Sequence, residues 1–81
     1  MWVMTDEGEL VNLDHVEFIR VEEDEDSGAQ EVRAYPAQAQ PDEELYYVLA
    51  SAVSGDRAGE LVRGFFEALS AGNPAHDFGP P

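Results

Sequence analysis

The feature that most constrains this chain is an apolar stripe near its C-terminal end, whose spacing is that of one face of an α-helix. Six apolar residues recur at intervals of three and four: Ala58, Leu61, Val62, Phe65, Phe66 and Leu69. Ser54 is suited to cap the start of this helix, and Gly72 is suited to end it. Gly59 and Gly64 lower the intrinsic helicity, so the helix depends on packing against the rest of the chain.

The first twenty residues carry hairpin signals. Two β-prone segments, residues 2–5 and 10–13, are separated by an acidic turn in which Gly8 can adopt a positive φ. The apolar residues that follow are spaced by three and then by two, which indicates a 3₁₀ turn or a bulge that leads into a strand over 17–23. Asn12 is placed to bond an exposed backbone donor of that turn.

The middle of the chain continues in the same style. Five adjacent carboxylates, residues 22–26, repel one another and need water, so they are expected at a protruding hairpin tip. Residues 31–35 alternate as a strand that ends at Pro36. A polar loop is expected over 37–43, and residues 44–50 form the most β-prone segment of the chain.

These elements predict an α+β fold. We expect an antiparallel β-meander of four to five strands with the C-terminal helix packed on one face. A chain of 81 residues builds one hydrophobic core, so residues 1–72 are expected to form a single domain. Residues 73–81 are rich in proline and glycine and are expected to form a flexible tail.

Charge excludes several classes of partner. The chain has 18 acidic and 4 basic residues, a formal net charge of −14, and all four basic residues are arginines. Such a chain repels nucleic acid and anionic lipid. Because no apolar run is long enough to span a bilayer and no secretion signal is evident, we expect no membrane association and a cytoplasmic location.

The acidity itself has three interpretations. It can be the solvated surface of a protein from a salt-adapted or high-GC organism. It can steer the protein toward a partner with a basic surface. It can also imitate nucleic-acid phosphates and so occupy a DNA-binding protein.

The N-terminal residues carry one resemblance. Trp2, Thr5, Gly8 and the Leu-Val-Asn-Leu segment at 10–13, followed by spaced valine and isoleucine, resemble small bacterial and phage proteins with such a hairpin and a closing helix. The order of elements is also similar to that of FlbD-like flagellar-operon proteins. The resemblance implies a shared hairpin fold, and it carries over no catalytic residue, because the matching residues are structural.

Catalysis and metal binding find little support in the residues. The chain has no cysteine, and its two histidines are His15, beside the expected turn, and His76, in the expected tail. A hydrolase that uses Asp14 and His15 is the enzyme hypothesis to weigh, but neighbours on a turn usually diverge. A calcium loop beginning at Glu23 would need a carboxylate where Ala34 stands. We therefore predict a non-enzyme with no metal and no cofactor.

What remains is a surface that binds another protein. Tryptophan and tyrosine are enriched where interfaces form. The predicted partner-binding residues are therefore the acidic tip and exposed aromatic residues: Glu22, Glu23, Asp24, Glu25, Asp26, Trp2, Tyr35 and Tyr46, with Tyr47 as a further candidate. The leading hypothesis is a non-catalytic interaction module, regulator or adaptor that binds a basic protein surface, as a homodimer. The alternative is a nucleic-acid-mimicking inhibitor or immunity-type protein of phage or mobile-element origin.

Overall fold

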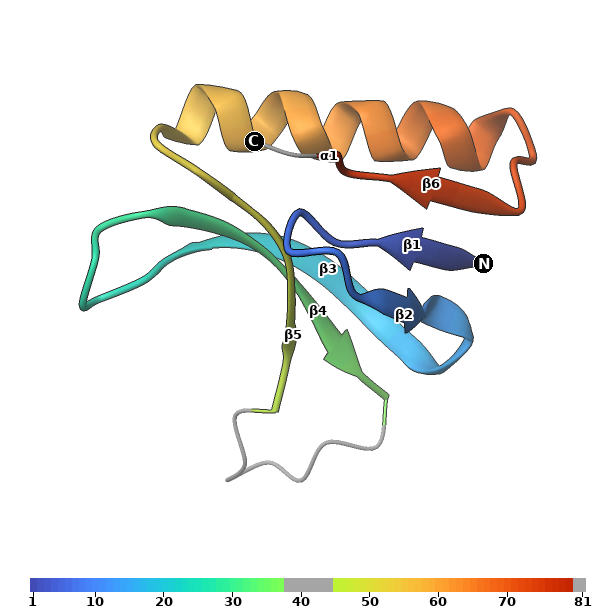
Figure 1. Cartoon of the computed structure of the whole chain (residues 1–81), viewed down its shortest axis with the longest axis horizontal. Coiled ribbons are helices and arrows are strands. Elements are labelled where there is room, and N and C mark those ends of the chain that lie inside the picture. Colours follow the sequence, from blue (N-terminus) through green and yellow to red (C-terminus); the bar gives the residue numbers. More distant parts are fainter. Residues whose placement is uncertain (38–44, 80–81) are drawn as a thin grey trace.

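A computed structural model of the chain describes residues 1–37 and 45–79. Six short strands form two three-stranded sheets, and one α-helix packs on the second sheet (Figure 1). In chain order the elements are β1 Trp2–Met4, β2 Leu10–Asn12, the 3₁₀ helix η1 Leu13–His15, β3 Val16–Glu23, β4 Gln30–Pro36, β5 Tyr47–Ala52, α1 Gly55–Ser70 and β6 Ala75–Asp77. Sheet A has the order β2-β1-β6, and sheet B has the order β3-β4-β5. The α+β class is confirmed.

Sheet B is the antiparallel part of the predicted meander. β3 pairs with β4 and β4 pairs with β5, with one irregularity in each ladder. The alternation of β4 is as predicted: Val32 and Ala34 are buried toward the helix, and Arg33 and Tyr35 lie on the other face. Most of the loop predicted over 37–43 lies outside the described residues.

Sheet A departs from a simple meander. The predicted β1–β2 hairpin is present, and Gly8 in its turn has a φ of 86°. Asn12 accepts a hydrogen bond from the backbone N–H of Asp14 at 3.1 Å, which caps η1. Because β1, β2 and β6 form a separate sheet, in which β1 and β6 are parallel, the prediction of one antiparallel meander is wrong in this detail.

The C-terminal segment explains the second sheet. Residues 75–77 form β6 and pair with β1 in parallel, where the sequence predicted a flexible tail over 73–81. Phe78 is buried, and its ring lies 5.7 Å from that of Phe65 and 4.9 Å from that of His76. This aromatic contact holds the segment in place, and the last two residues of the predicted tail lie outside the described residues.

Helix α1 begins and ends close to the predicted residues. The Ser54 hydroxyl accepts a hydrogen bond from the N–H of Arg57, and Gly72 has a φ of 75° just after the C-terminal end. Phe65 is buried, but Phe66 is 64% exposed and Leu69 is 49% exposed. The predicted stripe was therefore too wide, because sheet B covers only the centre of the helix face.

The core joins both sheets to the helix. Its fully or nearly buried members are Val3 from sheet A, Phe65 from the helix, Phe78, and four residues of sheet B: Val32, Ala34, Leu49 and Ala50. Within residues 1–37 and 45–79, no helix is long and apolar enough to cross a membrane.

Candidate acidic and aromatic binding site

The hairpin between β3 and β4 ends in a turn with its own hydrogen bonds. The N–H of Asp24 donates to the carbonyl of Ala29, and the N–H of Gly28 donates to the carbonyl of Asp24, both at 2.8 Å. The Ser27 hydroxyl donates to the Asp24 carboxylate at 2.8 Å and lowers the pKa of that carboxyl. Gly28 has a φ of 74°, which the turn requires. The predicted acidic tip is thus an ordered turn closed by Asp24.

Aromatic rings line the face of sheet B that points away from the helix. Phe18 on β3 stacks on Tyr35 of β4, with ring centroids 4.7 Å apart. Tyr46, just before β5, lies against Tyr35 at 5.7 Å. The rings come together because Phe18 and Tyr35 are cross-strand neighbours in the ladder of β3 and β4.

Two arginines lie over these rings. The guanidinium of Arg20 is 4.8 Å from the centroid of Tyr35, and that of Arg33 is 4.2 Å from the centroid of Tyr46. Each arginine also pairs with a carboxylate of its own strand at 2.7 Å, Arg20 with Glu22 and Arg33 with Glu31. The rings of the aromatic face therefore contact charged groups, on the side of sheet B that faces away from the apolar core.

The Arg33–Glu31 pair is the more enclosed of the two. The side chain of Arg33 is 11% exposed, and that of Glu31 is 16% exposed. Burial disfavours the charged guanidinium, but hydrogen bonding with Glu31 and Tyr35 outweighs this and raises the pKa of Arg33. Arg33 is therefore a fixed cation that lies over the ring of Tyr46.

The acidic tip and the aromatic face meet in one concave surface of about 320 Å³, which we call the acidic–aromatic site. It is lined by Arg20, Glu22, Glu23, Asp24, Glu25, Asp26, Arg33, Tyr35 and Tyr46. Seven of the eight predicted partner-binding residues are among them. Trp2 is not, because it lies on β1 in sheet A, where it is 51% exposed. Tyr47 does not line the site either.

Three residues on the face of sheet B that carries Tyr35 were not among the predicted site residues. Phe18, Arg20 and Arg33 have the same two-residue period as Tyr35, and this period was the signal available to find them. Their position next to the tyrosines depends on the register between β3 and β4. That register, with an irregularity between Val16 and Phe18, cannot be read from composition or spacing.

The carboxylates of the tip are not equivalent. Glu22 is paired with Arg20, and Asp24 closes the turn. Glu23, Glu25 and Asp26 form no ion pair within the described part of the chain. These three carboxylates are therefore available to attract a cationic group from outside.

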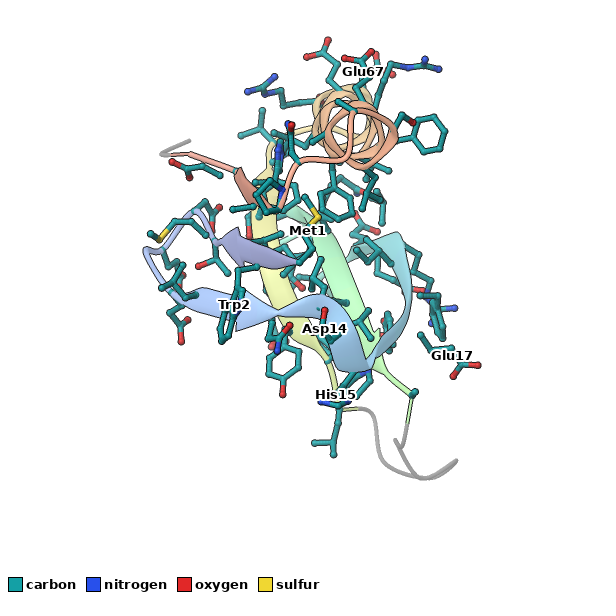
Figure 2. All side chains as sticks on the ribbon, turned by 90° about the vertical axis from the view of Figure 1, so that its right-hand side faces the viewer. Met1, Trp2, Asp14, His15, Glu17 and Glu67 are labelled. Atoms are coloured by element: carbon teal, nitrogen blue, oxygen red, sulfur yellow. The ribbon has the colours of Figure 1, made fainter. Side chains whose placement is uncertain are left out.

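Asp14 and His15, the two residues considered for catalysis, lie outside the acidic–aromatic site. The Asp14 carboxylate lies 2.7 Å from the amino group of Met1, and this contact lowers the pKa of Asp14. Among residues 1–37 and 45–79, no group of three or more histidine, cysteine, aspartate or glutamate side chains could hold a metal ion. Figure 2 shows Asp14 and His15 on the side of the molecule that carries Met1 and Trp2.

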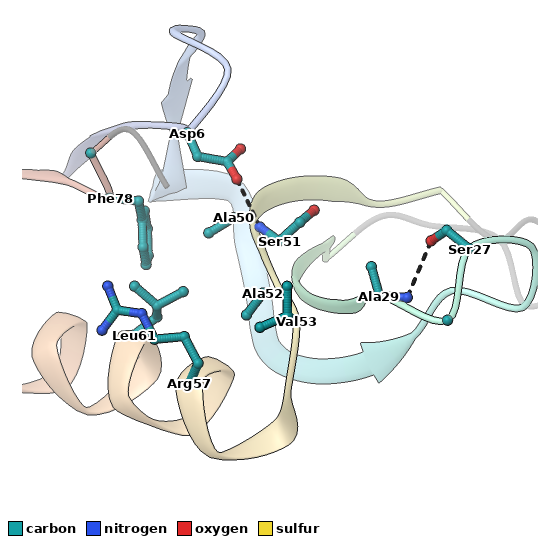
Figure 3. A pocket seen from close by; sticks show the side chains of 12 residues that line it. Asp6, Ser27, Ala29, Ala50, Ser51, Ala52, Val53, Arg57, Leu61 and Phe78 are labelled. Carbon is teal, nitrogen blue, oxygen red and sulfur yellow. Dashed lines mark hydrogen bonds between the residues drawn. The ribbon is translucent and has the colours of Figure 1, made fainter.

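A second, larger hollow lies between the helix and sheet B. It has a volume of about 570 Å³, and Figure 3 shows the residues around it: Asp6, Ser27, Gly28, Ala29, Ala50, Ser51, Ala52, Val53, Arg57, Leu61, Phe78 and Gly79. Its two charged side chains are engaged within the chain: Asp6 accepts from the N–H of Ser51, and Arg57 pairs with Glu60. The turn at Ser27–Ala29 borders this hollow, while residues 22–26 line the acidic–aromatic site.

Comparisons with known proteins give no indication of the function of this chain. No protein-family model, no curated protein and no solved structure matches it.

Proposed function

We propose that this protein is a non-catalytic interaction module that binds a basic protein surface through the acidic–aromatic site. The observation that carries the proposal is the meeting of unpaired carboxylates and two adjoining tyrosine rings in one concave surface. Carboxylates supply long-range attraction, and aromatic rings supply contact area at low cost in side-chain entropy. The net charge of −14 adds to the attraction for a basic partner.

The arrangement supports an adaptor more than a nucleic-acid mimic. A mimic needs carboxylates spaced like phosphates along an extended face. Here Glu23, Glu25 and Asp26 lie at the end of one hairpin, and rings adjoin them. Tyrosine rings beneath a guanidinium contribute little to phosphate mimicry, but they suit contact with arginine or lysine side chains.

The test replaces the three unpaired carboxylates with their neutral isosteres: Glu23→Gln, Glu25→Gln and Asp26→Asn. Glu22 and Asp24 are kept, because they hold Arg20 and the turn in place. The matched control carries Glu7→Gln, Glu9→Gln and Glu67→Gln, which change the net charge equally at exposed residues outside the site. The probe is an oligoarginine peptide, and its association rate is measured at low salt.

We expect the tip variant to slow association by about tenfold and the control by much less, because rim charges act mainly on the association rate. Raising the salt from about 0.15 M to about 1 M shortens the screening length from about 8 Å to about 3 Å and should remove the difference. Equal slowing in both variants would show that net charge alone attracts the peptide, and it would overturn the proposal.

A further inference from the structure

The two edges of sheet B differ in whether other parts of the chain form hydrogen bonds with them. On the β5 edge, Asp6 binds the strand twice: its N–H donates to the carbonyl of Leu49 at 3.1 Å, and its carboxylate accepts from the N–H of Ser51 at 2.8 Å. On the other edge lies β3, the longest strand, with eight residues. In the part of the chain that the structure describes, no strand pairs with the free edge of β3, the edge that faces away from β4. Such an edge is a template for another strand.

The inner side of the β3 edge offers an apolar surface. A hollow of about 470 Å³ opens beside the first half of β3, with Val16 and Ile19 of the strand and Phe65 and Leu69 of the helix in its lining. Leu69 is 49% exposed there. A strand placed beside β3 would lay the side chains of one face into this hollow.

The outer side of the same edge is charged and aromatic. Phe18 and Arg20 are exposed there, and Glu22 leads to the acidic tip. In Figure 2 the side chain of Glu17 points away from the body of the molecule, and this carboxylate borders the hollow beside the first half of β3. A strand beside β3 would direct its alternate side chains toward these groups and toward the acidic–aromatic site.

We infer that the basic partner binds as an extended segment that adds a fourth strand to sheet B along β3. Its side chains alternate, with arginine or lysine toward the acidic–aromatic site and valine, isoleucine or leucine toward the hollow. A second copy of this chain fits this edge less well, because β3 carries Glu17, Glu22 and Glu23 against a single Arg20. The inference rests on the proposed function, and it specifies the conformation and the residue pattern of the partner.

The experiment compares peptides of equal length and equal composition. One alternates arginine and valine, and a second places all arginines before all valines. Two further peptides alternate but carry N-methyl groups, either on every arginine or on every valine. Because successive N–H groups of a strand point to opposite edges, only one of the two methylated sets faces β3.

We expect the alternating peptide to bind about tenfold more tightly than the block peptide and to slow amide exchange in β3. One methylated peptide should lose about tenfold in affinity, and the other should bind like the unmethylated peptide. Leu69→Lys should weaken the alternating peptide more than the block peptide. Phe66→Lys, an equal charge change on the same helix, should affect both peptides alike.

The failures of the two proposals are distinguishable. If all four peptides bind equally and in a salt-dependent manner, the acidic attraction stands and the strand addition is overturned. If none binds, the proposed function fails and this inference fails with it. If the free chain sediments as a dimer with amide exchange already slowed in β3, a second copy occupies the edge and the inference is overturned.

Discussion

The two faces of sheet B are built from the same strands and differ in almost every other respect. Toward the helix, Val32, Ala34 and Leu49 are at most 1% exposed and belong to the core. On the opposite face, Tyr35 stacks on Phe18 and shares its surroundings with two arginines and the acidic tip. The inner face therefore stabilises the fold by burying apolar area, and the outer face presents its rings and charges outside this core.

The largest expected effect tests the inner face. Phe65→Ala removes a buried ring that contacts Phe78, so it should lower the free energy of unfolding by about 3–5 kcal/mol. Phe66→Ala, at the exposed neighbouring position, should cost about 0.5 kcal/mol. Denaturant unfolding measures both variants. Equal losses would show that the helix does not close the core through Phe65.

The next effect tests how the outer face is held together. Arg33→Met leaves Glu31 without its partner in an enclosed site, so we expect a loss of about 2 kcal/mol, between the values for exposed and buried pairs. The double variant Glu31→Gln/Arg33→Met should recover part of this loss in the same unfolding measurement. If the double variant is less stable than Arg33→Met, the unpaired carboxylate of Glu31 is not the cause of the stability loss.

A smaller effect separates the outer face from sheet A. Tyr46→Ala removes a ring of the acidic–aromatic site and should weaken binding of the alternating arginine–valine peptide by several-fold, up to about tenfold. Trp2→Ala removes an exposed aromatic residue from sheet A and should leave the affinity unchanged. Isothermal titration with both variants decides. A larger loss for Trp2→Ala would move the binding surface to sheet A.

The smallest effect concerns the turn that carries the carboxylates. The Ser27 hydroxyl lowers the pKa of Asp24. This hydrogen bond therefore stabilises the turn fully at pH values above the usual carboxyl pKa of about 4. That contribution is lost as the pH falls through the lowered pKa. Following the Asp24 carboxyl carbon by NMR, we expect Ser27→Ala to raise the pKa toward its usual value. Ser27→Thr, which keeps a hydroxyl, should leave it low, and an unchanged pKa in Ser27→Ala would assign the shift to another group.

Local patterns predicted the elements that depend on local physics. The helix, its Ser54 cap, the Gly8 hairpin and the turn at the acidic tip each follow from the conformational preferences of a few neighbouring residues. These preferences act over one or two turns of chain, so a single sequence is enough to read them.

Long-range pairing accounts for what was missed. β6 has three residues and no strong β signal, and it forms because β1 offers an edge and Phe78 reaches Phe65. Similarly, the placement of Phe18 against Tyr35 depends on strand register. The sequence predicts that Trp2 is exposed like the tyrosines, but its place in a separate sheet depends on the pairing of β1 with β2 and β6.

The most direct measurement of the central claim is an NMR titration of the labelled protein with the alternating arginine–valine peptide, following backbone amides. We predict that the largest shifts fall at residues 18–26, at Tyr35 and at Tyr46, and that amides around the apolar hollow near Ala52 and Val53 change little. Shifts concentrated at that hollow or along the exposed side of α1, with residues 18–26 unaffected, would contradict the claim that the outer face of sheet B is the binding surface.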